Sequence, residues 1–281
     1  MLPLRANPAN MTQFIKMHGL GNDFLVLDAR QQPVALNAPQ VRALANRHTG
    51  IGFDQLILIE PSLVADVRLR FWNSDGGEVA ACGNGSRAAA SLLGGQQRIE
   101  TKAGLLNSDA MTGGAEVDMG TPRWDWDAVP LAYPMDTGSL PLAWGDSGEE
   151  LAHPAALSVG NPHVVFFVPD AAAVALETLG PAIEHDPVFP ERVNVGIAQV
   201  VDRDHMILRV WERGAGATLA CGTGAVAAVA AAQRRGLVAQ RVRVSLPGGD
   251  LAVTRREDGH LLLAGPAVIA FTGEINLERY T

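Results

Sequence analysis

Lysine and cysteine are both scarce in this chain of 281 residues. Among its 22 basic residues only Lys16 and Lys102 are lysines, and the two cysteines are Cys82 and Cys221. Neither lysine follows a glycine-rich run, so a phosphate-binding loop is absent, and few lysines remain to form a Schiff base with pyridoxal phosphate. Two cysteines without a C-x-x-C pair argue against a structural zinc site.

Long apolar runs are missing as well. No uninterrupted run reaches the roughly 18 residues needed to span a bilayer, and residues 1–10 lack the apolar segment of a secretory signal. We therefore expect a cytosolic protein with a frayed leader at 1–10 and with reduced thiols. The net charge of −8 disfavours a broad nucleic-acid or anionic-membrane surface, and 47% hydrophobic residues allow a sizeable core.

The segments around the two cysteines repeat along the chain. Ala81–Ala89 aligns with Ala220–Ala228, and Cys221 follows Cys82 by 139 positions. At the same offset Asn22 falls on Asn161, Gln55 on Asn194 and Asn73 on Glu212. Four separated sites that keep one offset favour a duplicated chain over chance.

The coarse pattern of elements fits two similar halves. Helices are predicted at 39–47 with Asn37 as cap, at 83–93 before two glycines, at 171–179 and at 222–235. Strands with alternating or β-rich content outnumber these helices and are often linked as hairpins, so the predicted class is α+β. The boundary between the halves is expected in the weakly patterned stretch 122–148.

Each cysteine directly precedes a glycine-rich helix start. Free backbone N–H groups and the positive end of the helix dipole meet there, and both favour a thiolate and an anionic ligand. Inversion of a stereocentre requires a base on one face and an acid on the other. A matched pair of thiols suits that chemistry, although a single cysteine before a helix is usually a packing residue.

At these residues the chain resembles the diaminopimelate epimerases, a family of cofactor-independent two-cysteine amino-acid epimerases. The resemblance runs from Phe14 to about Ile275. Its motifs, in order, are Lys16–Phe24, Gly50–Gln55, Asn73–Glu78, Cys82–Gly85, Gly160–His163, Asn194–Gly196, Glu212–Gly216 and Ala220–Gly224. Several long motifs in order are far more specific than one short motif.

The resemblance implies two pseudo-symmetric lobes, each a mostly antiparallel sheet wrapped round a central helix. The N-terminal lobe would comprise residues 11–126 with 266–281 returning to it, and the C-terminal lobe residues 127–265. It also implies a homodimer that uses no cofactor. From the charge, the missing apolar runs and the cysteine count, we expect a cytoplasmic protein that holds no metal and binds neither nucleic acid nor membrane.

The implied reaction is the conversion of L,L-diaminopimelate to the meso form, for lysine and peptidoglycan precursors. Cys82 and Cys221 would be the acid/base pair, supported by His163 and Glu212. The implied substrate-binding residues are Asn22, Gln55, Asn73, Gly83, Asn84, Asn161, Asn194, Glu212, Arg213, Gly222 and Thr223. Arg213 can grip a distal carboxylate with two parallel hydrogen bonds, and paired amides can donate as well as accept.

Two other functions remain open at this point. Proline and hydroxyproline racemases share the two-cysteine architecture, but they tend to carry His where this chain has Asn84, and they lack the segment Glu212–Gly216. A thiol-redox or ligand-binding protein whose cysteines form a regulatory disulfide is also compatible with two cysteines. Loss of epimerisation in each reduced Cys→Ser variant would discriminate against the redox protein.

Overall fold

The computed structural model describes residues 11–80, 82–145 and 151–280, so the expected leader at 1–10 lies outside the described residues. The chain divides into two compact units. The first ends at Val117 and takes in the chain from Pro266 onward, and the second is Asp118–Gly265. Residues 118–126 therefore belong to the second unit, whereas the expected boundary placed them in the first.

The first unit is built on a mixed sheet. Strands β1 (Thr12–Gly19), β2 (Asn22–Asp28), β3 (Gln55–Glu60), β4 (Val67–Asn73) and β6 (Gln96–Thr101) form its centre. Parallel pairing joins β2 to β3 and β4 to β6, and the other pairs are antiparallel. The sheet is completed by β5 (Glu78–Val79), β7 (Gly104–Met111), β8 (Gly114–Asp118) and β19 (Val268–Ile275), and a 3-10 turn follows at Leu277–Arg279.

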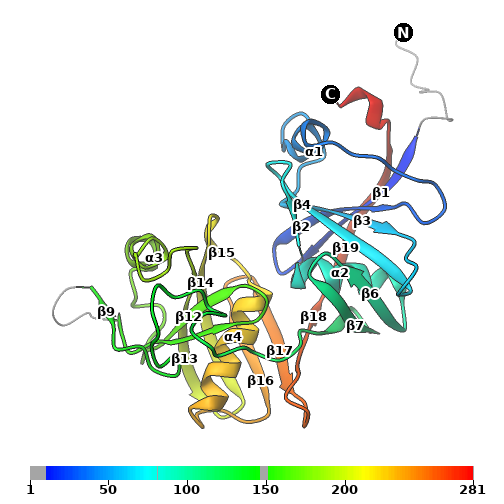
Figure 1. Ribbon diagram of the computed structural model, residues 1–281. Coiled ribbons are helices and arrows are strands. Elements are labelled where there is room, and N and C mark those ends of the chain that lie inside the picture. The colour runs from blue at the N-terminus through cyan, green and yellow to red at the C-terminus, as the bar shows by residue number, and fades with distance from the viewer. Residues whose placement is uncertain (1–10, 81, 146–150, 281) are drawn as a thin grey trace. The chain divides into compact units, whose positions relative to one another are not determined.

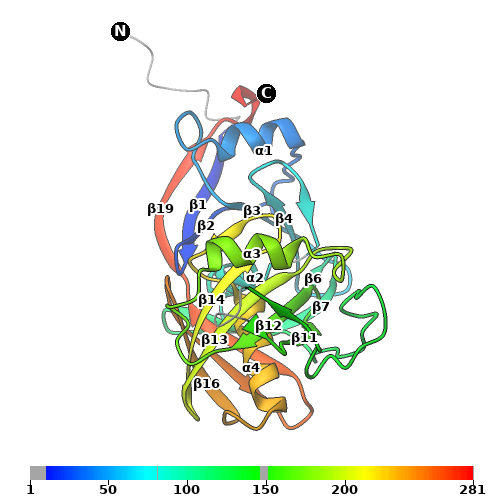
Figure 2. The same ribbon diagram turned by 90° about the vertical axis from the view of Figure 1, so that its left-hand side faces the viewer.

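Two helices cover opposite faces of this sheet. Helix α2 (Gly83–Leu93) contacts β1, β2, β3 and β7, and α1 (Ala38–Ala45) lies on the other side (Figures 1 and 2). Because side chains alternate along a strand, β2 and β3 must be apolar on both faces. Those that pack with α2 include Phe24, Val26, Ile57 and Ile59. Those that pack with α1 include Leu25, Leu27, Leu56 and Leu58.

The second unit repeats this plan. Its central strands are β12 (Pro162–Phe167), β13 (Asn194–Asp202), β14 (His205–Glu212) and β16 (Arg241–Leu246). Helix α4 (Gly222–Arg234) runs along them (Figure 1), and α3 (Leu176–Glu184) packs in a separate apolar cluster with β12 and β13. The remaining strands are β9 (Ala143–Trp144), β10 (Leu151–Ala152), β11 (Ala155–Ser158), β15 (Gly216–Thr218), β17 (Gly249–Arg255) and β18 (Leu261–Pro266).

The internal repeat is confirmed at the level of strand register. Phe24 pairs with Gln55 in the parallel ladder of β2 and β3, and His163 pairs with Asn194 in that of β12 and β13. His163 and Asn194 follow Phe24 and Gln55 by 139 positions, the offset that separates the two cysteines. Helix α4 likewise starts 139 residues after α2. The predicted α+β class with mostly antiparallel pairing is therefore what the chain forms.

Helices begin within one residue of the predicted start where a side chain caps the first turn. Asn37 and Gln40 form a reciprocal capping box at α1, and α2 ends at Gly94 with φ of 75°, a conformation that favours glycine. The prediction of a helix at 171–179 was wrong, because α3 begins only at Leu176. Arg209 Nη1 donates to the carbonyl oxygens of Ala171 and Val174 at 3.0 and 2.7 Å. In a helix that began at residue 171, these oxygens would instead accept backbone N–H groups of the helix itself.

Candidate active site

Cys82 is the N-cap residue of α2. Its backbone is extended, with φ of −146° and ψ of 114°, and its Sγ accepts the Gly85 N–H at 3.2 Å. A side chain at residue 85 would approach Phe71 to 3.0 Å, so glycine allows the helix to pack close to the sheet. The thiol is half-buried and lies where the helix dipole favours negative charge.

Cys221 occupies the same position at α4. Its φ is −126° and its ψ is 109°, and its Sγ accepts the Gly224 N–H at 3.4 Å. This thiol is buried, with 3% of its surface exposed. Burial raises the pKa of Cys221 well above its ordinary value, and the charge and hydrogen bond of Glu212 raise it further. Bonds from Thr223 and Gly224 act in the opposite direction, so this site favours the neutral thiol.

A chain of polar contacts connects Cys221 to a buried imidazole. Thr223 Oγ1 lies 3.5 Å from Cys221 Sγ and accepts Asn161 Nδ2 at 3.3 Å. His163 Nε2 lies 3.0 Å from Asn161 Oδ1, a carbonyl oxygen, so Nε2 carries the proton. Burial lowers the pKa of His163 to about 3, and the charge of Arg213 acts in the same direction. The imidazole is therefore neutral at physiological pH.

The segment after β14 is held by buried polar groups. Asn194 Oδ1 accepts the Arg213 N–H at 3.0 Å, and its amide donates to the carbonyl of Pro162 at 2.7 Å. Glu184, 2% exposed, accepts Trp211 Nε1 at 2.7 Å and the backbone N–H of residue 214 at 2.9 Å. The Arg213 side chain is exposed and donates to the carbonyl of residue 191.

In the first unit the predicted amides form two pairs. Gln55 Nε2 donates to Asn73 Oδ1 at 2.9 Å, because these residues face each other across β3 and β4. Asn84, in the first turn of α2, donates to Asn22 Oδ1 at 3.4 Å. The bond from Asn84 thus places the Asn22 amide close to the start of α2, where Cys82 is the N-cap.

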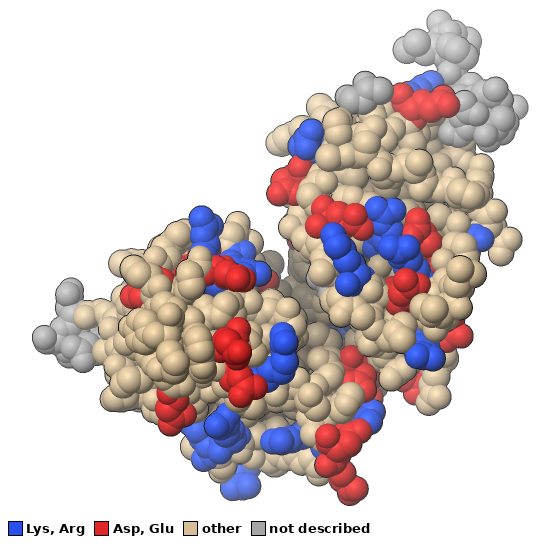
Figure 3. Space-filling view, in the orientation of Figure 1, with Lys and Arg blue, Asp and Glu red and all other residues tan. Residues whose placement is uncertain are grey.

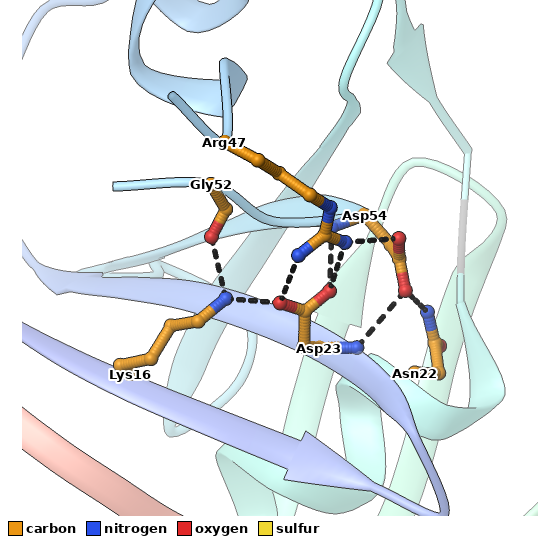
Figure 4. Close-up of polar contacts among 6 residues, drawn as sticks. All are labelled: Lys16, Asn22, Asp23, Arg47, Gly52 and Asp54. Carbon is orange, nitrogen blue, oxygen red and sulfur yellow. Dashed lines mark hydrogen bonds and ion pairs between the residues drawn. The ribbon is translucent and has the colours of Figure 1, made fainter. Parts of the chain in front are cut away.

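Sequence reasoning missed an ionic network that holds Asn22. Asp54 accepts Asn22 Nδ2 at 3.0 Å, and Arg47 bridges Asp54 and Asp23 at 2.8 and 2.7 Å (Figure 4). Lys16, 8% exposed, binds Asp23 and the carbonyl of residue 52 (Figure 4). Burial raises the pKa of Asp23, but its bonds to Arg47 and Lys16 outweigh burial and hold that pKa well below its usual range. A lysine inside an apolar strand was the available signal.

The predicted residues thus fall into two sets, one in each unit. Asn22, Gln55, Asn73, Gly83 and Asn84 accompany Cys82 in the first. In the second, Gly222 begins α4 next to Cys221. Among the described residues no group of three or more His, Cys, Asp or Glu side chains is arranged to hold a metal ion. No helix in the described part of the chain is long and apolar enough to cross a membrane.

The two duplicated α+β units form a fold that solved structures also have. A hydroxyproline epimerase from Agrobacterium vitis has a TM-score of 0.68 at 14% identity, covering 95% of this chain and 91% of that one. A PhzF-family phenazine biosynthesis protein from Bacillus anthracis has a TM-score of 0.66 at 17% identity, covering 94% and 99%. These solved structures share the fold.

Sequence comparison identifies the family within that class. The diaminopimelate epimerase family model matches residues 14–124 and 155–270. Proteins named diaminopimelate epimerase from Rhizorhabdus wittichii and Erythrobacter litoralis are each 56% identical over 269 residues. The match covers 95% of this chain and 97% and 98% of theirs. The chain belongs to the diaminopimelate epimerase family.

Proposed function

We propose that this chain is an isomerase that converts L,L-2,6-diaminopimelate to meso-diaminopimelate, without pyridoxal phosphate or another cofactor. The product would serve lysine biosynthesis and peptidoglycan precursors. The single observation that carries the proposal is that each half of a duplicated chain places one thiol at the N-cap of an equivalent buried helix. Membership of the family supplies the substrate.

The reaction requires two thiols that change roles. One cysteine, as thiolate, removes the α-proton of the substrate and leaves a planar carbanion. The other, as thiol, gives its own proton to the opposite face of that carbon. After one turnover the two protonation states are exchanged, and the reverse reaction restores them. Backbone N–H groups at Gly83 and Gly222 would stabilise the charge that develops on the adjacent carboxylate.

His163 and Glu212 would assist the second thiol. Glu212 is hydrogen-bonded to Cys221 and also accepts the Thr218 hydroxyl at 2.6 Å, which fixes the carboxylate beside the sulfur. His163 acts at a distance, because its neutral ring orients Asn161 and through it Thr223. His163 would therefore position the thiol rather than exchange a proton itself.

The remaining site residues would bind the substrate. An exposed guanidinium has five N–H donors, so Arg213 can bind the distal carboxylate while Nη1 keeps its bond to the carbonyl of residue 191. The other proposed substrate-binding residues are Asn22, Gln55, Asn73, Asn84, Asn161, Asn194, Glu212 and Thr223. Amides can contact both the ammonium and the carboxylate of an amino acid, which suits a substrate with two such ends.

The test uses the reduced protein with L,L-diaminopimelate in deuterated water and no added cofactor. We expect meso product with deuterium at one α-carbon, and loss of both signals in Cys82→Ala and in Cys221→Ala. Racemisation of proline in place of these signals would instead support the proline racemase. Absence of exchange with either substrate would contradict an epimerase and favour a redox or binding protein.

We further propose a cytoplasmic homodimer that binds neither nucleic acid nor membrane. On the face seen in Figure 3, basic and acidic side chains are interspersed, which gives no broad basic surface for a polyanion. Val268, Ile269 and Phe271 on β19 are 45–50% exposed, and a second copy of the chain would cover them. Sedimentation should show a dimer that Phe271→Glu converts to monomer, whereas Met111→Glu, at a position 51% exposed, should not.

A further inference from the structure

Arg87 is a fully buried arginine on α2, five residues after Cys82. Its exposed fraction is 0%. Its Nε donates to the carbonyl of Pro266 at 3.2 Å, and its Nη1 donates to Asn84 Oδ1 at 3.1 Å. The remaining nitrogen, Nη2, is buried with no acceptor among the described residues.

The backbone makes room for this guanidinium. A Cβ added at Gly19 would lie 2.7 Å from Arg87 Nη2, so a larger residue there would displace the charged group. The strands packed against α2 present apolar side chains to it. By alternation, most titratable and charged residues of those strands point to the opposite face, namely Lys16, His18, Asp23, Glu60 and Asp109. Asp28, at the end of β2, shares the alternation of Phe24 and Val26, but its carboxylate is paired with Arg30 and is 44% exposed.

A buried cation needs a compensating negative charge. Arginine is kept charged by its chemistry, and removing that charge from water is costly unless an anion is close. No described carboxylate forms an ion pair with Arg87, and the charge that acts on it is that of Cys82. Burial lowers the pKa of Arg87 to about 10, and the Cys82 charge acts in the opposite direction. Because the attraction is mutual, the guanidinium must favour the Cys82 thiolate equally.

The corresponding position in the other unit has no such charge. At the repeat offset Arg87 falls on Val226, a buried apolar residue of α4. Cys221 faces the negative charge of Glu212 instead. The two helices therefore offer their thiols opposite electrostatic surroundings although the N-cap geometry is the same.

We propose that Arg87 is a positioning residue that holds Cys82 as the thiolate in the resting protein, while Cys221 rests as the thiol. For catalysis this rests on the proposed function: the resting protein is ready to remove a proton with Cys82 and to give one with Cys221. The second effect of Arg87 is geometric, since its Nη1 orients Asn84 beside Cys82. The thiol states themselves can be measured without turnover.

The first experiment measures thiolate content at Cys82. In a Cys221→Ala background, the rate of alkylation by iodoacetamide is followed from pH 5 to 10 with Arg87, Arg87→Lys and Arg87→Met. With Arg87 we expect the midpoint to lie below the ordinary thiol pKa of about 8.5. With Arg87→Met the midpoint should rise by at least about one pH unit, which is a tenfold shift of the equilibrium away from the thiolate. Arg87→Lys should retain part of the shift. An unchanged midpoint in folded Arg87→Met would overturn the proposal.

The second experiment keeps Arg87 and so does not depend on whether its variants fold. Urea unfolding is compared from pH 6 to 10 for the native chain, Cys82→Ala and the matched control Cys221→Ala. If the pKa of a thiol is lower in the folded than in the unfolded protein, the free energy of unfolding increases as pH rises from the folded pKa to the unfolded pKa. The native chain should therefore gain stability over Cys82→Ala between pH 6 and 9.

The control should behave in the opposite way. Cys221 has a raised pKa, so the native chain should lose stability relative to Cys221→Ala as pH rises above about 8.5. Parallel pH dependence of the native chain and Cys82→Ala would contradict a resting thiolate. Neither experiment uses diaminopimelate, so a failure of the proposed function would appear separately, as absence of deuterium exchange.

Discussion

Thr223 Oγ1 lies 3.5 Å from Cys221 Sγ and is the last member of a hydrogen-bonded chain that begins at the buried ring of His163. Asn161 connects the two. The neutral imidazole fixes the amide, the amide fixes the hydroxyl, and the hydroxyl contacts the thiol. The tautomer of a histidine in the core thus determines the orientation of a group beside a reactive sulfur.

Removal of the Thr223 hydroxyl should raise the pKa of Cys221. The contact from Thr223 lowers that pKa, so Thr223→Val removes a stabilising interaction of the thiolate at nearly constant volume. We expect the limb of the pH–rate profile that reports Cys221 to move to higher pH, with kcat reduced by about 10-fold to 100-fold. Thr223→Ser is the control and should keep the profile. An unaltered profile in Thr223→Val would show that the hydroxyl does not act on the sulfur.

Neutralising Glu212 should make Cys221 more acidic but a poorer catalyst. The Glu212 charge raises the pKa of Cys221, so Glu212→Gln should lower it. In a Cys82→Ala background, alkylation of Cys221 should shift to lower pH. With both cysteines present, Glu212→Gln should reduce kcat by about 10²-fold or more, because the charged carboxylate, which contacts both Thr218 and Cys221, is replaced by a neutral amide with only one acceptor oxygen. Faster alkylation with undiminished epimerisation would exclude a catalytic role for the carboxylate.

His163 should make the fold sensitive to acid. Its pKa is about 3 in the folded protein and 6.5 ordinarily, so below pH 6.5 the unfolded chain binds a proton that the folded chain does not. Stability is then lost as pH falls from 6.5 toward 3, by roughly 2–3 kcal/mol at pH 4.5. Urea unfolding at pH 7.5 and 4.5 should show a larger loss for the native chain than for His163→Gln, whose amide can still donate to Asn161. Equal losses would mean that His163 does not titrate on unfolding.

The ionic network at Asn22 should affect substrate binding more than turnover. Asp54→Ala removes the acceptor of Asn22 Nδ2, so the amide loses its fixed orientation (Figure 4). We expect KM to rise by about tenfold with a smaller change in kcat, the pattern of a lost binding contact. Asp28→Ala is the matched control, since Asp28 forms an exposed pair with Arg30 and should leave both constants unchanged. A fall in kcat at constant KM would contradict the proposed binding role.

Much of the candidate site could be predicted from sequence because its signals are local. A polar residue at a strand end or before a glycine-rich helix start has a place set by the element itself, as for Gln55, Asn73 and Cys221. The start of α3 could not be predicted, because the carbonyl of Ala171 accepts a hydrogen bond from Arg209, which lies 38 residues further along the chain, and not from a helical N–H group. The expected boundary after residue 126 also differs from the division between Val117 and Asp118, because the extent of a compact unit depends on contacts between distant segments.

The sequence by itself determined the duplication, the two helix starts with their thiols, and the family. Backbone hydrogen bonding and capping act over a few residues, so a pattern within one segment is enough to specify them. Only the tertiary structure decided which charges are buried and what they face. Arg87 meets Gly19 and the carbonyl of Pro266, which lies 179 residues further along the chain. Burial in a medium of low polarity is a property of the packed unit, and it is burial that makes one charge act strongly on another.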